Sequence, residues 1–257
     1  MNAPVPPPGD AEPTAVISAI TALGAFFALE ETGAAPPAGW QPMSAALLGD
    51  RVTGVRQWLA AAGGQPAGAV EPRVAASVAH LGLAARLVSP ALAAAVLFGR
   101  PLLFALHEVR WQPVLGGPVP LALPAGALGA PLAGLEALAG LLAARLLAGP
   151  LEELAAVFGT FGVSRHILRG NTASAVNGAA VSLVRARPEL AVRTRAFTGL
   201  LLDRPPLAGE STAEEGVFRR RSCCLIYRAG PGGKGALCGD CALDLRPATG
   251  RVPDSAS

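Results

Sequence analysis

The sequence is poor in charge, in aromatic side chains and in lysine. Charged residues make up 15% of the 257 positions, aromatic residues make up 5%, and Lys234 is the only lysine. The net charge of +3 is too small to indicate a nucleic-acid partner, and no basic sheet studded with aromatics is evident. We therefore expect no nucleic-acid binding. Hydrophobic residues reach 51%, largely alanine and leucine, whose short side chains bury little area each, so the core needs many helix contacts.

The chain also lacks an uninterrupted run long enough to span a membrane. The apolar stretch Ala15–Leu29 is shorter than the roughly 20 residues that a spanning helix needs. The stretch Ala91–Gly99, which runs on to Leu106, is broken by Arg100-Pro101, and Leu132–Leu147 is broken by Glu136 and Arg145. No basic segment precedes an apolar core at the start, so residues 1–13 read as a disordered leader and not as a signal peptide. We expect a cytoplasmic protein, with peripheral contact at the cytoplasmic face of the inner membrane or with an importer.

Common nucleotide-binding and hydrolase motifs are absent as well. The glycine-rich run Gly230–Gly235 resembles a phosphate loop, but its Lys234 is not followed by serine or threonine and no buried strand precedes it. No G-x-G-x-x-G follows a strand, and no G-x-S-x-G elbow occurs. The sequence therefore gives no evident flavin or nicotinamide site.

Helical periodicity dominates what is present. Thr14 can cap a helix that runs to about Glu31, Pro72 opens a second helix, and the Ser89-Pro90 pair is typical of an N-cap and first turn, so a new helix is expected to start there and stop at Gly99. Further helices are predicted at Leu132–Leu147, Leu151–Phe158, Val163–Arg187 and Glu189–Asp203. One short β-hairpin is expected, with strands Val109–Pro113 and Val119–Ala122 around a Gly-Gly-Pro turn.

These patterns predict a mainly α protein with a minor α+β element. A helical body covering residues 14–203 with its one hairpin precedes a proline- and glycine-rich linker at 204–216. A small cysteine-rich subdomain at 217–245 and a frayed tail at 246–257 complete the expected organisation.

All four cysteines fall within nineteen residues near the C-terminus, as the adjacent pair Cys223-Cys224 and the motif Cys238-Gly239-Asp240-Cys241. Four clustered thiols form a metal site, an iron–sulfur site or two disulfides, and a reducing cytosol disfavours disulfides. The C-x-x-C turn aims two sulfurs at one centre. An adjacent pair suits a two-iron [2Fe–2S] cluster better than a single zinc ion, although zinc stays open on spacing alone.

The cysteine segment resembles the C-terminal signature of the FhuF-type ferric-siderophore reductases. The matching residues run from Phe218 to Arg228 around the cysteine pair and from Leu237 to Leu243 around the C-x-x-C. The spacer of thirteen residues between the two pairs is about three longer than in the family pattern. Weaker likenesses occur in Arg86-Leu87-Val88-Ser89-Pro90, around Trp111-Gln112-Pro113, and in Leu168-Arg169-Gly170-Asn171.

The resemblance implies a [2Fe–2S] cluster held by Cys223, Cys224, Cys238 and Cys241. It implies a one-electron reduction of a ferric siderophore that releases Fe(II), with electrons supplied by a donor protein or a soluble reductant. Nearby cations would stabilise the reduced cluster, and the residues expected to tune it or to dock a partner are Arg220, Arg221, Tyr227 and Arg228.

Two other readings remain on sequence grounds. A zinc-stapled module could bind a partner through its arginine-rich face without redox chemistry. A relative of siderophore synthetases is the third reading, against which stands the lack of a recognisable ATP-binding half. Asn171, a mid-helix amide among apolar neighbours, is expected to be a hydrogen-bonded core residue or to line a substrate cleft.

Overall fold

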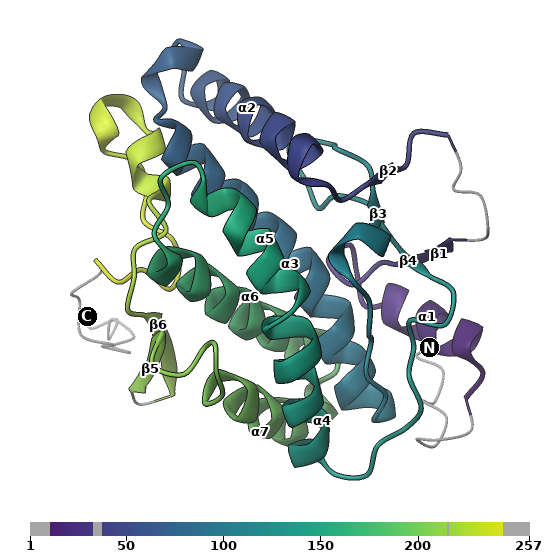
Figure 1. The fold of residues 1–257 in the computed structure, drawn as a ribbon. Coiled ribbons are helices and arrows are strands. Elements are labelled where there is room, and N and C mark those ends of the chain that lie inside the picture. The colour runs from purple at the N-terminus through teal and green to yellow at the C-terminus, as the bar shows by residue number, and fades with distance from the viewer. Residues whose placement is uncertain (1–10, 33–37, 215, 244–257) are drawn as a thin grey trace, which may run out of the picture.

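The computed structural model describes residues 11–32, 38–214 and 216–243, and over these the protein is mainly helical. Helices hold 56% of the residues and strands 8%, which confirms the expected fold class. Figure 1 shows the helices lying side by side, with a small sheet near the N-terminal helix and the cysteine segment at the opposite side. The expected leader and tail lie largely outside the described residues.

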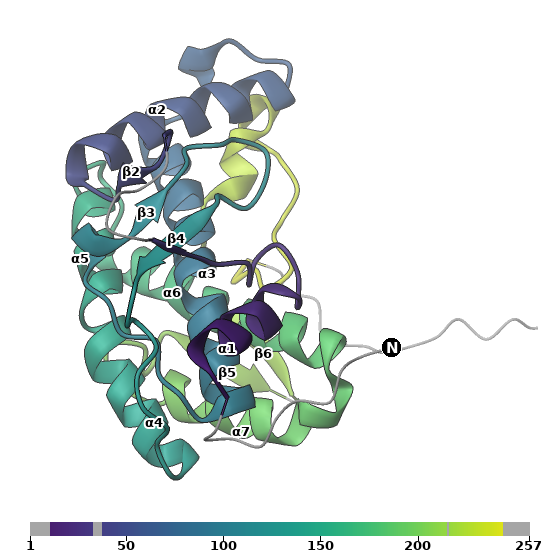
Figure 2. The same ribbon diagram turned by 90° about the vertical axis from the view of Figure 1, so that its right-hand side faces the viewer.

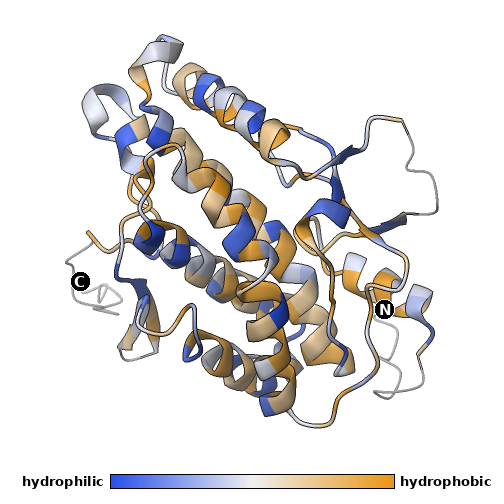
Figure 3. Ribbon diagram, in the orientation of Figure 1, coloured by the Kyte–Doolittle hydropathy of each residue, from blue (hydrophilic) through white to orange (hydrophobic). Residues whose placement is uncertain are grey.

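Helix α3, Pro72–Phe98, forms the centre of the molecule. It packs against α1 (Pro13–Thr21), α2 (Ala45–Ala62), α5 (Pro150–Gly159), α6 (Arg165–Ala186) and α7 (Ala191–Leu202). Its alanines let these neighbours approach closely, and most of its length is buried. Figure 3 shows hydrophobic colour along the central helices, with hydrophilic residues at the start of α6 and on β6.

Among the described residues, α3 alone is long and apolar enough to cross a membrane, and 83% of its most apolar window is buried inside the protein. Such burial is typical of the core helix of a soluble protein.

Helix α3 also continues without a break through Ser89 and Pro90, so the helix start expected there is wrong. The hydroxyl of Ser89 donates back to the carbonyl of Ala85 at 2.7 Å instead of capping a new helix. The predicted stop at Gly99 is confirmed by its left-handed conformation, φ 64°.

The remaining helices follow the predictions with small shifts at their ends. They include α4, Leu135–Leu142, which continues into a π-helical turn, η3, at Ala143–Leu147. The first helix is the exception, because the expectation that it runs to about Glu31 is wrong. Helix α1 spans Pro13–Thr21, the side chain of Thr21 exchanges hydrogen bonds with the backbone of Leu29, and Glu31 belongs to a strand. Helix α2 is an element that the sequence patterns did not reveal.

The predicted hairpin is the centre of a larger sheet. Strands β3 (Arg110–Trp111) and β4 (Leu121–Pro124) pair antiparallel, while β1 (Glu30–Thr32) joins β4 in parallel and β2 (Gln41–Pro42) joins β3. The order is β1-β4-β3-β2. Figure 2 shows this sheet beside α2 and α1. The expectation of a single hairpin is therefore incomplete, because the hairpin is part of a four-stranded sheet.

A second hairpin positions the cysteines. Strand β5, Ser211–Glu214, lies within the stretch expected to be a linker, and it pairs antiparallel with β6, Val217–Arg220. Strand β6 packs against α6, and the short helix η5, Ile226–Ala229, packs against α3. The cysteine segment is thus attached to the two central helices.

Candidate metal centre

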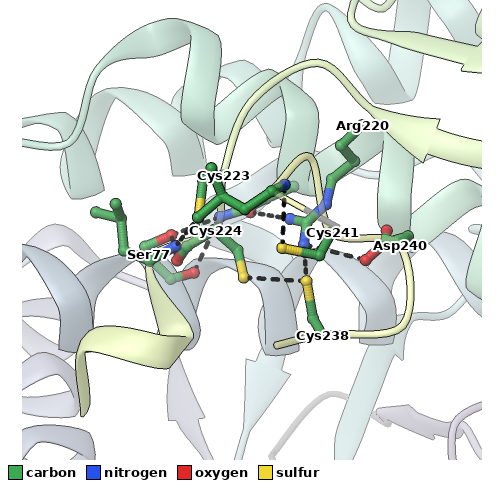
Figure 4. Close-up of polar contacts among 10 residues, drawn as sticks. Ser77, Arg220, Cys223, Cys224, Cys238, Asp240 and Cys241 are labelled. Atoms are coloured by element: carbon green, nitrogen blue, oxygen red, sulfur yellow. Dashed lines mark hydrogen bonds and ion pairs between the residues drawn. The ribbon is translucent and has the colours of Figure 1, made fainter. Parts of the chain in front are cut away.

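The four cysteines come together at the end of β6, in a loop that covers the N-terminal halves of α3 and α6 (Figure 4). The sulfur atoms of Cys224 and Cys238 lie 3.5 Å apart. Cys224 and Cys241 are buried, while Cys223 and Cys238 are partly exposed. All four are free thiols, which leaves them available as ligands.

The spacing of the central sulfur pair suits metal binding. Two thiolates on one tetrahedral metal with bonds of about 2.3 Å lie about 3.8 Å apart, close to the observed separation of Cys224 and Cys238. The other two sulfurs accept backbone N–H groups, Cys223 from Leu225 at 3.3 Å and Cys241 from Leu243 at 3.4 Å. In iron–sulfur proteins, backbone N–H groups commonly donate to the cysteine sulfurs, and these hydrogen bonds raise the reduction potential of the cluster.

Among the described residues, no group of three or more potential ligands is already arranged around one point. The donor set nevertheless fits a thiolate-ligated centre, because one sulfur pair is at ligand spacing and the second pair belongs to the same loop.

Arg220 is the cation of this site. Its guanidinium is completely buried and donates to the sulfur of Cys238 at 2.8 Å, to Asp240 at 3.1 Å and to Oδ1 of Asn171 at 2.8 Å. Burial by itself lowers the pKa of Arg220, but the Asp240 carboxylate and the cysteine sulfurs outweigh it and raise that pKa above its ordinary value. The guanidinium therefore stays charged beside the sulfurs.

The environment favours a thiolate at the central pair. The pKa of Cys224 is lowered to about 5, first by the hydrogen bond it shares with Cys238 and further by the N–H of Ile226 and by Arg220. The pKa of Cys238 is raised in turn, because the pair holds one proton between two sulfurs. Burial raises the pKa of Cys223. Since the thiolate is the form that ligates metals, the site has a thiolate before any metal arrives.

The helical body holds the site through a buried polar chain. Asn171 on α6 donates its amide to both the carbonyl and the hydroxyl oxygen of Ser77 on α3, at 3.0 Å each. The Ser77 hydroxyl in turn donates to the carbonyl of Cys224 at 2.8 Å. Ser77 and Asn171 are both completely buried. The chain Ser77–Asn171–Arg220 therefore connects the two central helices to both cysteine pairs.

Close backbone approach brings α6 under the cysteine loop. A Cβ atom added to Gly170 would lie 2.1 Å from the hydroxyl of Ser222, the residue before the cysteine pair. That hydroxyl donates to the carbonyl of His166 at 3.2 Å. Glu210 adds a second clamp, since its carboxylate pairs with His166 at 2.5 Å and its carbonyl accepts the N–H of Arg221 at 2.9 Å.

The turn after the cysteine pair is held in an uncommon conformation. Leu225 has a backbone φ of 69°, a left-handed value that residues other than glycine seldom adopt. The turn sets the N–H of Leu225 against the sulfur of Cys223. Backbone of this kind costs on the order of 1–2 kcal/mol and is kept where the surrounding contacts hold it.

Of the four predicted tuning or docking residues, Arg220 alone is seen to donate to a cysteine sulfur within the described part of the chain. The side chain of Arg221 is exposed. Arg228 pairs with Glu71 at the start of α3, 2.5 Å away, and Tyr227 contributes its carbonyl to a turn with Gly235. These three residues attach or border the loop, and their expected tuning roles stay predictions.

Sequence reasoning missed Ser77 and Asp240 as parts of the site. Asn171 was singled out, and its reading as a satisfied core amide is confirmed, with the sulfur-bound Arg220 as one of its partners. The short likeness at Leu168–Asn171 contained two contact residues, Gly170 and Asn171. For Ser77, no sequence signal existed, since a helical serine in an alanine-rich stretch is unremarkable.

Fold and site together describe a mainly helical protein with four free cysteines in one segment near its C-terminal end. Residues 220–243 match the family model described as the FhuF 2Fe-2S C-terminal domain. This match covers the same segment that carries the sequence resemblance, around the four cysteines. No curated protein matches the chain.

Proposed function

We propose that the protein is a ferric-siderophore reductase, which passes one electron to the chelated Fe(III) from a [2Fe–2S] cluster held by Cys223, Cys224, Cys238 and Cys241. The observation that carries the proposal is the match of residues 220–243 to the 2Fe-2S domain, in the segment where buried Arg220 donates to the sulfur of Cys238 and the sulfur of Cys224 lies 3.5 Å from that sulfur. A bound [2Fe–2S] cluster would supply reversible one-electron transfer.

The chain's own residues are suited to hold added negative charge. Arg220 brings a fixed positive charge to the sulfur of Cys238, and the N–H groups of Leu225 and Leu243 point at the sulfurs of Cys223 and Cys241. These groups favour the reduced state, because reduction adds negative charge at the sulfurs. Asp240 opposes this effect in part while it fixes the guanidinium in place.

The substrate chemistry requires little else from the protein. Siderophores bind hard Fe(III) through oxygen atoms far more tightly than they bind Fe(II), so addition of one electron weakens the chelate. One electron enters from a donor protein or a soluble reductant, and one leaves to the ferric ion. No bond to the protein forms and no acid or base is needed. We place this reaction in the cytoplasm, near the importer or membrane face from which the chelate arrives.

A zinc-stapled structural protein is the second candidate, because the 3.5 Å sulfur pair suits a single tetrahedral zinc ion as well as an iron. The two candidates differ in colour, metal content and magnetism. The match to a 2Fe-2S domain model favours the cluster.

The decisive experiment is anaerobic purification, followed by iron, sulfide and zinc analysis and electron paramagnetic resonance after dithionite reduction. We expect two irons and two sulfides per chain and a reduced-state signal that each Cys→Ser substitution removes. The reduced protein is then mixed with a ferric siderophore and an Fe(II)-trapping dye, with heat-denatured protein as the control. One zinc per chain and no cluster after reconstitution would contradict the proposal, as would a loaded cluster that reduces no ferric siderophore.

A further inference from the structure

A surface trough lies between α6, α7 and the β5–β6 hairpin, with a cavity volume of about 420 Å³. Both helices contribute residues at the spacing i, i+3, i+4, i+7, which places one face of each helix on the trough. The lining includes the apolar side chains of Val181, Leu202 and Phe218 and the polar side chains of Asn177 and Arg195. Its volume falls within the range of about 300–1,000 Å³ typical of small-molecule pockets.

The trough borders the strand and the helix that carry Arg220 and Asn171. Phe218 and Arg220 lie two positions apart on β6, so they share one face of the strand at a separation of about 7 Å. On α6, Asn177 follows Asn171, the partner of Arg220, by six residues, or about 9 Å along the axis. One end of the trough therefore lies close to the sulfur-bound guanidinium, where electron transfer over a short distance is favourable.

Two polar side chains in the trough are available to a ligand. Asn177 and Arg195 make no hydrogen bond or ion pair with any residue that the structure describes. Because α6 and α7 are joined by a short connection and run antiparallel, these residues lie toward opposite ends of the trough. Asn177 is at the end near the cysteines, and Arg195 is about two turns away.

The charge of the lining selects the kind of ligand. Arg195 is the one charged side chain among the described residues that line the trough. An arginine in a largely apolar trough binds carboxylate or phenolate oxygens with paired hydrogen bonds. An amphiphilic chelate with apolar arms and a negatively charged, oxygen-rich head is complementary to this arrangement.

We propose that this α6–α7 trough is the docking site for an anionic ferric chelate, with Arg195 binding its peripheral oxygens and Asn177 contacting the end nearest the cysteines. The inference rests on the proposed function and deepens it, since it names the site and the charge class of the substrate. The apolar walls exclude water from the arms of the chelate and hold it at one end of the β6 strand that leads to Arg220.

Binding can be tested without electron transfer, because gallium(III) forms the same chelates as ferric iron and is not reduced by the protein. The probes are a trianionic gallium tris-catecholate and a cationic gallium trihydroxamate, titrated calorimetrically into the purified holoprotein. Arg195→Gln removes the cation, and Val181→Trp fills the trough from a position that is 50% exposed. Their matched controls are Arg185→Gln, an exposed arginine outside the trough on α6, and Val192→Trp, which is 80% exposed on α7.

We expect the tris-catecholate to bind the parent protein and both controls equally. Arg195→Gln should weaken it by about tenfold, the usual cost of losing a hydrogen bond to a charged group, and should leave the trihydroxamate unchanged. Val181→Trp should weaken it at least as much. Thermal melting of each variant checks that the fold is intact.

Other outcomes separate this proposal from the reductase proposal. Unchanged affinity in both Arg195→Gln and Val181→Trp would place the chelate elsewhere. A loss with Val181→Trp alone would overturn the anionic class, and a parent protein that binds neither gallium chelate would overturn the docking site. If Val181→Trp slows reduction of the cluster by an acidic donor protein without affecting chelates, the trough belongs to the donor and the proposal is wrong. Paramagnetic resonance and Fe(II) trapping test the reductase proposal independently in each case.

Discussion

Arg220 donates to Oδ1 of Asn171 at 2.8 Å, across 49 positions of sequence and between a strand and a buried helix. The same guanidinium reaches the sulfur of Cys238 at the same distance. An amide in the helical core therefore helps to fix the position of the positive charge nearest the cysteine sulfurs. Because a guanidinium has a planar fork of donors, holding one arm restricts the direction of the other.

Replacing Arg220 by glutamine should lower the midpoint potential of the cluster. The variant removes a buried positive charge and leaves Asp240 without its partner, so the reduced state loses stabilisation on the order of 50–150 mV. A redox titration followed by paramagnetic resonance measures this shift. Arg221→Gln is the matched control, because its side chain is exposed, and its potential should stay close to that of the parent. Equal shifts in the two variants would refute a specific role for Arg220.

Replacing Asn171 by leucine should destabilise the protein. The change leaves the Ser77 carbonyl and one arm of Arg220 without their buried partner, at a cost of about 2–4 kcal/mol in the free energy of unfolding. Urea unfolding measures the loss. Asn177→Leu, on the same helix and without a described hydrogen bond, should change stability by much less. A similar loss in both variants would mean that helix propensity or bulk is responsible and not the buried chain.

The contact between Gly170 and Ser222 predicts that the usual stabilisation from replacing a helical glycine by alanine is absent at this position. On a helix, alanine is favoured over glycine by about 1 kcal/mol. We expect that gain for Gly178→Ala, where nothing lies near the added Cβ. Gly170→Ala should show no gain, because the Ser222 hydroxyl must turn away and lose its bond to His166.

A double-mutant cycle checks the cause of this difference. In a Ser222→Ala background, Gly170→Ala should stabilise the protein as Gly178→Ala does, which gives a coupling of about 1 kcal/mol between the two positions. Chemical denaturation of the four proteins supplies the values. Additive effects would show that α6 does not approach the cysteine loop as closely as described.

His80 predicts part of the pH dependence of stability. It is fully buried against the edge of Phe158, neither ring nitrogen has a described partner, and burial lowers its pKa to about 3. Between this value and the unfolded pKa near 6.5, the unfolded chain binds a proton that the folded protein does not. The stability tied to neutral His80 is therefore complete above pH 6.5 and lost as the pH falls toward 3.

From pH 7.5 to 5.5 this loss amounts to about 1.4 kcal/mol for one group. His80→Leu should be less sensitive to this pH change than the parent by that amount, as measured by urea unfolding at the two values. The exposed His107, changed to glutamine, is the control. Because other groups contribute to both curves, the difference between variant and parent isolates His80. Parallel curves would contradict the prediction.

Sequence patterns predicted the helical class and singled out the cysteine segment that matches the 2Fe-2S domain model, because helical periodicity and cysteine spacing are local signals. They failed where tertiary contacts decide. Pro90 is expected to start a helix, yet the surrounding core keeps α3 continuous across it. Strands β1 and β2 are too short to show alternation, and they exist because β4 and β3 offer partners far along the chain.

The candidate site shows the same division. The cysteines and Arg220 are recognisable within a single segment, whereas Ser77 carries no local mark of its role. Its importance arises when α3 and α6 pack and bring Asn171 and the Cys224 carbonyl to the same buried point. Composition and spacing contain no information on that meeting.

The hydrogen bond from Ser77 to the carbonyl of Cys224 has a consequence for engineering and for inheritance of the motif. Cys-Cys and Cys-x-x-Cys on a glycine-rich loop resemble a motif that could be moved to another protein. Here the site also depends on Ser77 and Asn171, which belong to two helices and lie 147 and 53 positions before Cys224. A peptide of the last forty residues, or the same loop grafted onto another scaffold, would lack the groups that orient Arg220 and its sulfur partner. The four-cysteine site depends on the whole fold, and a transplant must take α3 and α6 with it.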